Sequence, residues 1–226
     1  MKKSLFTAIA ALMAIVAIAA DSTPAQPTIN WGRVTSKYRL VDSVRQIVTV
    51  QYTGGWDCLV KLYEKSRVNG KVVWTETLSC DGHVGTNGID KEREGDRRTP
   101  TGDYEITVAY GIKNNPGTSL PYIDVVETTY CCAEPIAYNR IIDVREVQHD
   151  CKGEHMIEYT PEYNYGFFYD YNKECVYGKG SALFFHCTGP KPSTAGCVAV
   201  SEPDMVAILR ALEPGARIII DHMPKP

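Results

Sequence analysis

A histidine and a cysteine near the end of the chain have the spacing of a base and a nucleophile. His186 ends an apolar run, and Cys197 follows eleven residues later, after a loop rich in Gly and Pro. A neutral thiol attacks carbonyl carbons poorly, but a histidine within hydrogen-bond reach converts it into a thiolate. Ala195 and Gly196 before the cysteine leave room for a substrate, and backbone N–H groups there can face a developing oxyanion. The pattern predicts cysteine-based acyl transfer.

These residues also have two other interpretations. In a Cys-rich exported chain, one cysteine and one histidine are more often half of a disulfide and a structural histidine. A papain-type protease is disfavoured because such enzymes place the cysteine before the histidine with a long separation. Here His186 precedes Cys197, so the acyl-transfer interpretation is the stronger one.

The elements that must position this pair are predicted to be mostly β. Asn69-Gly70 is a strong hairpin signal between two runs rich in β-formers. Ser201 begins a capping-box pattern, and apolar residues at positions 205, 208, 209 and 212 then form one face of a short helix. The segments that we expect to be strands are residues 45–52, 59–64, 72–78, 103–108, 166–171 and 216–221.

The N-terminus has the layout of a secretory signal peptide. Lys2 and Lys3 precede an apolar run over residues 5–20, with small residues at the expected cleavage position. The run is short for a membrane-spanning helix, so an uncleaved anchor is the weaker alternative. We therefore expect a signal peptide (1–20), a linker or N-terminal arm (21–43) and one catalytic domain (44–226). Removing residues 1–20 changes the formal charge from −3 to −5, which gives no electrostatic reason to bind nucleic acid.

The chain has eight cysteines, which predicts disulfides in an exported protein. If Cys197 stays free, one other cysteine lacks a partner within the chain. We expect a bridge between Cys58 and Cys80, and a second that joins position 131 or 132 to position 151 or 175. A Cys187–Cys197 bridge would turn the enzyme off or be purely structural, and both alternatives stay open.

Two further groups of residues have structural rather than functional interpretations. Residues 163–172 are rich in aromatic side chains, which fit a core strand better than a sugar-stacking surface. His149, Cys151 and His155 lack the paired spacing that zinc prefers, so we predict no metal there. Residues 90–98 form a charge run, usually a solvated loop, before a turn that leads into a strand.

The same residues resemble the YkuD-like L,D-transpeptidases, in a branch with a short loop and a Thr-Ala-Gly-Cys-Val-Ala core. The match at the centre consists of His186, Thr194, Gly196, Cys197 and Val198. The resemblance covers roughly residues 45–221. Its supporting motifs, in chain order, are residues 91–96, 98–102, 138–140, 154–156, 171–172 and 180–182.

The resemblance implies a mostly β sandwich or barrel with one or two short helices. It also implies that Cys197 attacks a peptidoglycan stem peptide, that His186 moves the protons, and that the Cys187 carbonyl orients this histidine. Gly196 then belongs to the oxyanion hole. Thr194, Lys91 and Arg98 are the expected substrate contacts, the two cations for an anionic carboxylate.

The reaction needs no metal or organic cofactor. The expected location is the periplasm or cell wall, with a wall-attached protein as a further partner and membrane contact only through the signal peptide. An L,D-carboxypeptidase that uses water as acceptor, and a non-catalytic wall-binding domain, are the alternatives.

Overall fold

The computed structural model describes residues 30–147 and 151–222, so the predicted signal peptide lies outside the described residues. The β-forming runs expected from the sequence all become strands. Two α-helices, α1 (Trp31–Tyr38) and α2 (Glu202–Ala211), and two 3₁₀ helices, η1 (Met156–Glu158) and η2 (Glu162–Asn164), accompany them. The strands of this part of the chain are β1 (Gln46–Gly54), β2 (Asp57–Val68), β3 (Lys71–His83), β4 (Gly102–Gly111), β5 (Tyr122–Asp124), β6 (Thr129–Cys132), β7 (Arg140–Asp143), β8 (Glu154–His155), β9 (Gly166–Tyr169), β10 (Phe184–Cys187), β11 (Val198–Val200) and β12 (Arg217–His222).

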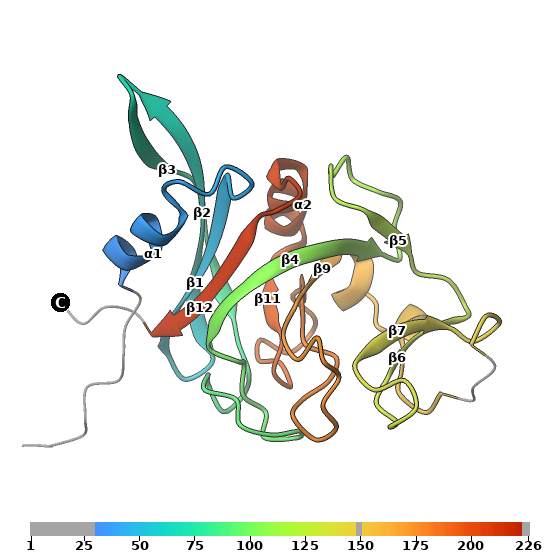
Figure 1. Ribbon diagram of the computed structural model, residues 1–226. Helices are drawn as coiled ribbons and strands as arrows, with labels where there is room; N and C mark the ends of the chain where they lie inside the picture. Colours follow the sequence, from blue (N-terminus) through green and yellow to red (C-terminus); the bar gives the residue numbers. More distant parts are fainter. Residues whose placement is uncertain (1–29, 148–150, 223–226) are drawn as a thin grey trace, which may run out of the picture.

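Eight of these strands close into a barrel, which confirms the mostly β prediction. The hydrogen-bonded order is β12-β1-β2-β3-β11-β10-β9-β4, and β4 pairs back with β12 to complete the ring. Strand β5 adds to the outer edge of β4. Figure 1 shows β4 crossing the molecule from β12 to β5. Closure removes the open sheet edges and places alternate side chains of each strand inside and outside.

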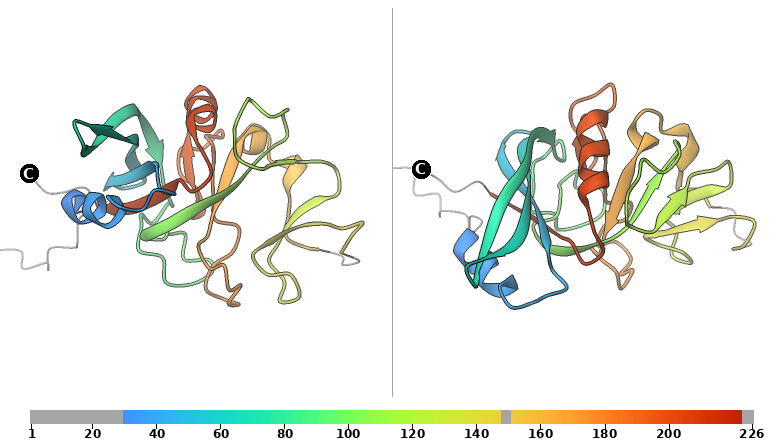
Figure 2. Two further views of the ribbon diagram at one scale, coloured as in Figure 1. Left: turned by 45° about the horizontal axis from the view of Figure 1, so that its top comes forward. Right: turned by 90° about the horizontal axis from the view of Figure 1, so that it is seen from above.

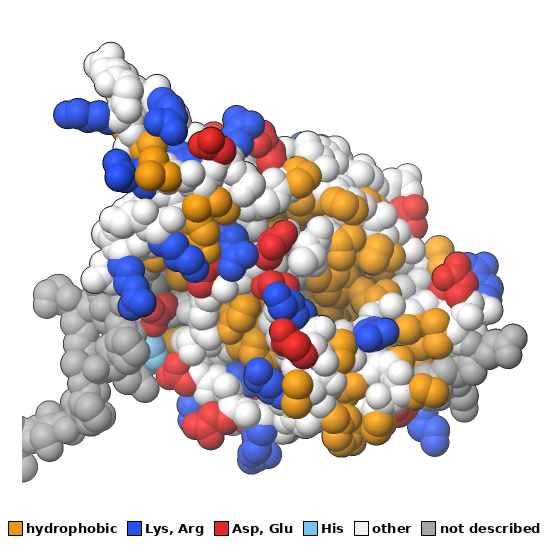
Figure 3. All heavy atoms as spheres, viewed as in Figure 1, with side chains coloured by type: hydrophobic (Ala, Val, Ile, Leu, Met, Phe, Trp, Pro, Cys, Tyr) orange, Lys and Arg blue, Asp and Glu red, His pale blue; other side chains and the backbone are white. Residues whose placement is uncertain are grey.

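The β2–β3 hairpin turns where the sequence predicts it. Asn69 and Gly70 both have positive φ, 50° and 77°, as a two-residue turn matched to strand twist requires. The hairpin tip projects beyond the barrel in Figure 1, and Lys and Arg side chains surround it in Figure 3.

Helix α2 confirms the predicted cap and apolar face. The Ser201 hydroxyl accepts a hydrogen bond from the Asp204 N–H, and the buried residues Met205, Ile208 and Leu209 pack into the main core. Figure 2 shows α2 standing between the strands of the two sides of the barrel. The helix therefore fills the space that the strands leave between them.

Helix α1 lies in the segment expected to be a linker. Asn30 caps its N-terminus, and Trp31, Val34 and Tyr38 pack with Ile219 of β12. The apolar face extends over only two turns of helix. This is too short for a helical repeat to be recognised in the sequence alone. Residues 30–38 thus form a helix that packs against the barrel wall.

A second, three-stranded sheet with the order β7-β6-β8 accounts for part of the irregular stretch at residues 111–180. It lies to one side of the barrel, beyond β5 and β9 in Figure 1. Figure 3 shows the face of the molecule hollowed between β4 and this sheet, with hydrophobic side chains lining the hollow. In the part of the chain that the structure describes, no helix has the length and hydropathy needed to cross a membrane.

The expected disulfides are not formed: all eight cysteines are free thiols. Cys58 lies opposite Gly82, whereas Cys80 lies opposite Val60. The first expected pair is therefore on neighbouring strands but two positions out of register, which the sequence spacing alone does not reveal.

Candidate active site

Strands β10 and β11 place the candidate base and nucleophile on one face of the barrel wall. They pair in parallel, with Phe185 opposite Val198 and His186 opposite Ala199. Side chains alternate along a strand, so Cys197, directly before β11, shares a face with Ala199 and hence with His186. The two side chains are diagonal neighbours on that face.

That face opens into a pocket of about 890 Å³, within the size range of small-molecule sites. Both His186 and Cys197 line it, and so does the exposed Ala195. Its walls come from the charge-run loop, the β6–β8 sheet, the segment around η2 and the loop between β10 and β11. The charged residues that line it are Lys91, Glu94, Arg97, Lys152, Glu154, Glu162 and Lys191.

The Cys197 thiol is buried and protonated. Its Sγ donates to the carbonyl oxygen of Ala182 at 3.2 Å and accepts from the N–H of Phe184 at 3.3 Å. The pKa of this thiol is raised to about 12, mainly by burial and also by the Glu154 carboxylate, while the Phe184 N–H and Lys91 act in the opposite direction. Among the described residues, its hydrogen bonds go to Ala182 and Phe184 rather than to His186. The thiol proton is therefore engaged with the Ala182 carbonyl oxygen in this structure.

The His186 imidazole is held in the form of a base. Its Nδ1 lies 2.8 Å from the carbonyl oxygen of Cys187, and because a carbonyl only accepts, Nδ1 carries the proton and Nε2 keeps its lone pair. The ring of Tyr163 meets it edge to face. Burial lowers the pKa of His186 below its ordinary value, so the imidazole is neutral at pH 7.

Cys187 contributes its backbone to the site, while its side chain points elsewhere. The Cys187 thiol is buried in the main core and contacts the Tyr165 carbonyl oxygen at 3.4 Å. Cys197 packs instead with Tyr110 and Phe184 in a separate cluster. Alternation along β10 and β11 thus puts the two sulfur atoms on opposite faces, and the Cys187–Cys197 bridge considered above is not formed.

Thr194 holds the turn before the nucleophile. Its Oγ1 accepts from the Gly196 N–H at 3.1 Å and donates to the Cys197 carbonyl oxygen at 2.7 Å. Gly196 has φ +146°, and a Cβ there would lie 2.9 Å from the backbone oxygen of Arg98. The turn therefore needs a glycine, and Thr194 acts on the nucleophile's position besides lining the pocket.

The charge-run loop is ordered around one buried ion pair. Lys91 Nζ lies 2.7 Å from Asp96 Oδ1, and their side chains are 2% and 9% exposed. Asp96 also accepts from the N–H groups of residues 92, 93 and 98, and its buried bonds with these donors and Lys91 hold its pKa well below the usual range. Lys91 therefore reaches the pocket with its charge already compensated. Arg98 donates to the Ile89 carbonyl oxygen instead of lining the pocket.

The other motifs quoted above meet at Glu94 and Asn139. Glu94 accepts from the hydroxyls of Tyr138 and Ser181, and Asn139 accepts from the Ala182 N–H at 3.2 Å. Asn139 also donates to the carbonyl oxygens of residues 171 and 172. These bonds fix the backbone at Ala182, whose carbonyl oxygen holds the nucleophilic thiol.

Glu154 is a site residue that sequence reasoning quoted in a motif without giving it a role. It lines the pocket, accepts a hydrogen bond from the Tyr163 hydroxyl at 2.5 Å, and acts electrostatically on Cys197. Burial raises the pKa of its carboxyl group above the ordinary value. A single acidic residue between a lysine-glycine pair and a histidine carries no local signal, so only the fold reveals its position.

This barrel and this pocket are those of a known class of enzyme. The family model described as YkuD, L,D-transpeptidase catalytic domain, matches residues 60–220, and the chain belongs to this family. The match spans the barrel from β2 to β12 and includes both His186 and Cys197. A search of curated proteins finds no match to the chain.

Proposed function

We propose that the protein is an exported L,D-transpeptidase that acts on peptidoglycan stem tetrapeptides through a Cys197 thioester. The observation that carries the proposal is the neutral, oriented imidazole of His186 on the same pocket face as the Cys197 thiol, within a YkuD domain. The signal-like sequence at residues 1–20 supports export to the periplasm or cell wall. Stem peptides are then the substrate, with a wall-attached protein as a further acceptor.

The first half of the reaction forms the acyl-enzyme. The Cys197 thiol leaves the Ala182 carbonyl and gives its proton to Nε2 of His186, and the sulfur attacks the carbonyl carbon of the third stem residue. The C–N bond to the terminal D-alanine breaks as its nitrogen takes the proton from His186. In the second half, an amine of another stem attacks the thioester, gives a proton to His186 and releases the thiol.

Backbone N–H groups at the nucleophile stabilise the oxyanion of each tetrahedral intermediate. The N–H of Cys197 is the first donor in this proposal. The N–H of Gly196 is already bonded to Thr194 Oγ1, so it becomes a second donor only when substrate displaces that hydroxyl. Lys91 and Arg98 play no substrate-binding part in it, because both are engaged within the protein. Among the pocket-lining cations, Arg97, Lys152 and Lys191 remain the candidates for a substrate carboxylate.

Intact-mass spectrometry of the reduced protein tests the proposal. The wild type and the Cys197→Ala variant are incubated with a tetrapeptide stem, and separately with a carbapenem, the β-lactam class that this family accepts. We expect a covalent adduct on the wild type and none on the variant. An added amine acceptor gives a cross-linked product if the enzyme is a transpeptidase, whereas release of free tripeptide alone identifies a carboxypeptidase. The absence of any adduct under reducing conditions would support a non-catalytic wall-binding domain instead.

A further inference from the structure

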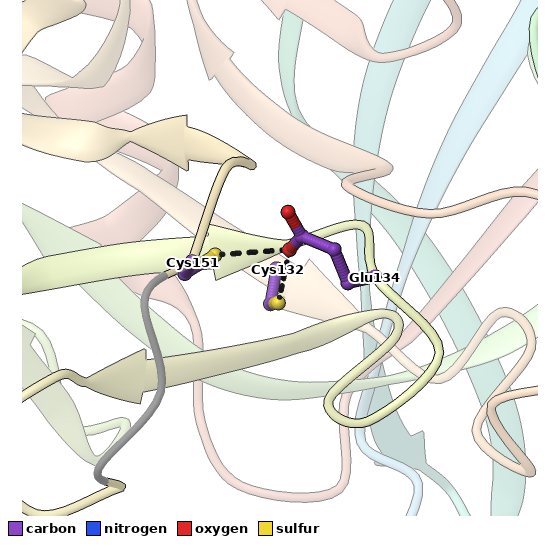
Figure 4. Close-up of side chains that lie close together, drawn as sticks. All are labelled: Cys132, Glu134 and Cys151. Atoms are coloured by element: carbon purple, nitrogen blue, oxygen red, sulfur yellow. Dashed lines mark hydrogen bonds between the residues drawn. The ribbon is translucent and has the colours of Figure 1, made fainter.

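Two thiols and a carboxylate meet outside the active site, at the edge of the small sheet. The Sγ atoms of Cys132 and Cys151 and a carboxylate oxygen of Glu134 all lie within 4.8 Å of one another. One oxygen, Oε2 of Glu134, is 2.8 Å from the Cys132 sulfur and 3.6 Å from the Cys151 sulfur. Figure 4 shows this oxygen directed at both sulfur atoms. The three side chains therefore converge on one small volume.

The fold, rather than sequence spacing, brings these residues together. Cys132 ends β6, and Cys151 precedes β8, which pairs with β6 so that Cys131 lies opposite Glu154. Gly153 allows this approach, because a Cβ there would lie 2.1 Å from the Cys131 carbonyl oxygen. A cluster built from a strand end and a distant loop has no short motif.

Backbone N–H groups orient two of the three side chains. The N–H of Lys152 donates to Oε1 of Glu134 at 2.7 Å, which leaves Oε2 facing the sulfur atoms. The N–H of Gly153 lies 3.3 Å from the Cys151 sulfur and donates to it. Such contacts fix ligand atoms and stabilise a thiolate, as outer contacts do around metal sites.

We propose that Cys132, Glu134 and Cys151 bind one Zn²⁺ ion. Two thiolates and a carboxylate are established zinc ligands, and a borderline-soft cation suits a mixed sulfur and oxygen set better than Mg²⁺ or Ca²⁺, which prefer oxygen alone. Binding releases the two thiol protons to solvent, because zinc is bound by thiolates rather than thiols.

The site would join two walls of the active-site pocket. Cys131 and Ala133, beside Cys132, line the pocket, and so do residues 152–154, directly after Cys151. The ion thus has a structural role at this edge and takes no part in acyl transfer. The proposal therefore stands or falls independently of the catalytic function.

A Co²⁺ titration of the reduced protein tests the site, because thiolate ligands give Co²⁺ an intense near-ultraviolet charge-transfer band. Every sample carries Cys197→Ala, so that the nucleophile does not contribute. We expect saturation at one equivalent, the intensity of two thiolates, and displacement of Co²⁺ by Zn²⁺ but not by Mg²⁺. Cys132→Ser and Cys151→Ser should each lose about half of the band. The isosteric Glu134→Gln should keep the band and weaken affinity at least about tenfold.

Two cysteine variants serve as controls. Cys58→Ser and Cys175→Ser remove thiols outside the cluster and should leave the titration unchanged. If a serine variant in the cluster fails to fold by circular dichroism, the Glu134→Gln comparison still decides. A full band in the Cys132→Ser, Cys151→Ser double variant overturns the proposal. The proposal is also overturned if the protein binds no Co²⁺ after reduction. This holds equally for protein that was isolated with a Cys132–Cys151 disulfide and then reduced.

Discussion

The thiol of Cys197 donates its hydrogen bond to the carbonyl oxygen of Ala182, 3.2 Å away, and not to the catalytic imidazole. Together with the Phe184 N–H, this contact stores the nucleophile as a buried thiol. Burial disfavours the charged thiolate, so the resting enzyme resists alkylation and oxidation of this cysteine. In the proposed reaction, substrate binding turns the side chain toward His186 before the proton is transferred.

The first prediction concerns the pH dependence of acylation. A general base must be neutral, and burial puts the pKa of His186 below its ordinary value of 6.5. The rate should therefore rise with pH through that lowered pKa and stay level across neutral pH. His186→Ala should lower the rate about 10²- to 10⁴-fold, the usual contribution of proton transfer.

Stopped-flow or mass-resolved acylation by a carbapenem measures both effects. His83→Ala is the matched control, because His83 pairs with Asp57 on the β2–β3 strands and does not line the pocket. An acid limb centred above pH 7, or an unchanged rate in His186→Ala, would contradict the assignment of His186 as base.

Thr194→Val should misplace the nucleophile. The change removes the hydrogen bonds from the Gly196 N–H and to the Cys197 carbonyl oxygen. At about 0.5–1.5 kcal/mol each, their loss should lower the free energy of unfolding by about 1–3 kcal/mol. Acylation should slow about ten- to a hundredfold, because small displacements of reacting atoms are costly.

Denaturant unfolding and acylation kinetics give the two values. Thr77→Val, which removes a hydroxyl that donates to the Leu62 carbonyl oxygen outside the pocket, is the control and should leave acylation unchanged. Wild-type kinetics in Thr194→Val would mean that its hydroxyl does not position Cys197.

Glu154→Gln should make the resting thiol more reactive. The Glu154 carboxylate raises the pKa of Cys197, so removing its charge should lower that pKa. At alkaline pH, where the carboxyl group is ionised, iodoacetamide should then alkylate Cys197 faster in the variant than in the wild type. Peptide mass mapping assigns the label to Cys197.

Glu158→Gln removes an exposed carboxylate, paired with His155, that has no such effect on Cys197, and should react like the wild type. Equal rates in Glu154→Gln and the wild type would show that Glu154 does not act on the thiol electrostatically.

Asp96→Asn should destabilise the protein in a pH-dependent way. Its pKa is held below the ordinary 3.8, so the folded state binds this proton more weakly than the unfolded state. The stabilisation is therefore present above about pH 3.8 and is lost as pH falls toward the folded-state value. Leaving Lys91 buried without its partner should cost about 3–5 kcal/mol near neutral pH.

Chemical unfolding at pH 7 and at acidic pH checks this prediction, with Glu92→Gln as the exposed control in the same loop. The difference between wild type and Asp96→Asn should shrink as the pH is lowered. A constant difference would mean that the ion pair contributes nothing through its charge.

Most of the barrel could be predicted from the sequence, because its strands and α2 have local sequence signals. The Asn69-Gly70 turn and the Ser201 cap are short-range signals that need no tertiary context. Helix α1 shows the opposite case, since its apolar face spans only two turns and matters through its packing on β12. Position, burial and pairing across the barrel cannot be derived from such local patterns.

At the site, residue types predicted which side chains share the pocket better than they predicted the contacts of those side chains. His186 and Cys197 share one pocket, as nucleophilic catalysis needs. Their common position could be predicted because a strand, a loop and a glycine turn follow one another directly in the sequence. Lys91 is different: the sequence predicts that it contacts a substrate carboxylate, and the structure pairs it with Asp96, five residues later, at the pocket wall. Glu154 reaches the pocket through the register of β6 and β8, which no local pattern encodes.

Because the eight strands form a closed ring, changes in the pocket wall during evolution can be separate from changes in the barrel strands. His186 lies on barrel strand β10 and Cys197 lies directly before β11, and the register of both strands is fixed by neighbours on both sides. Much of the pocket wall comes instead from the β6–β8 sheet and the loops around it. Insertions or substitutions there can therefore alter which acyl acceptor enters while the nucleophile stays in place, so new specificity need not begin with a loss of catalysis.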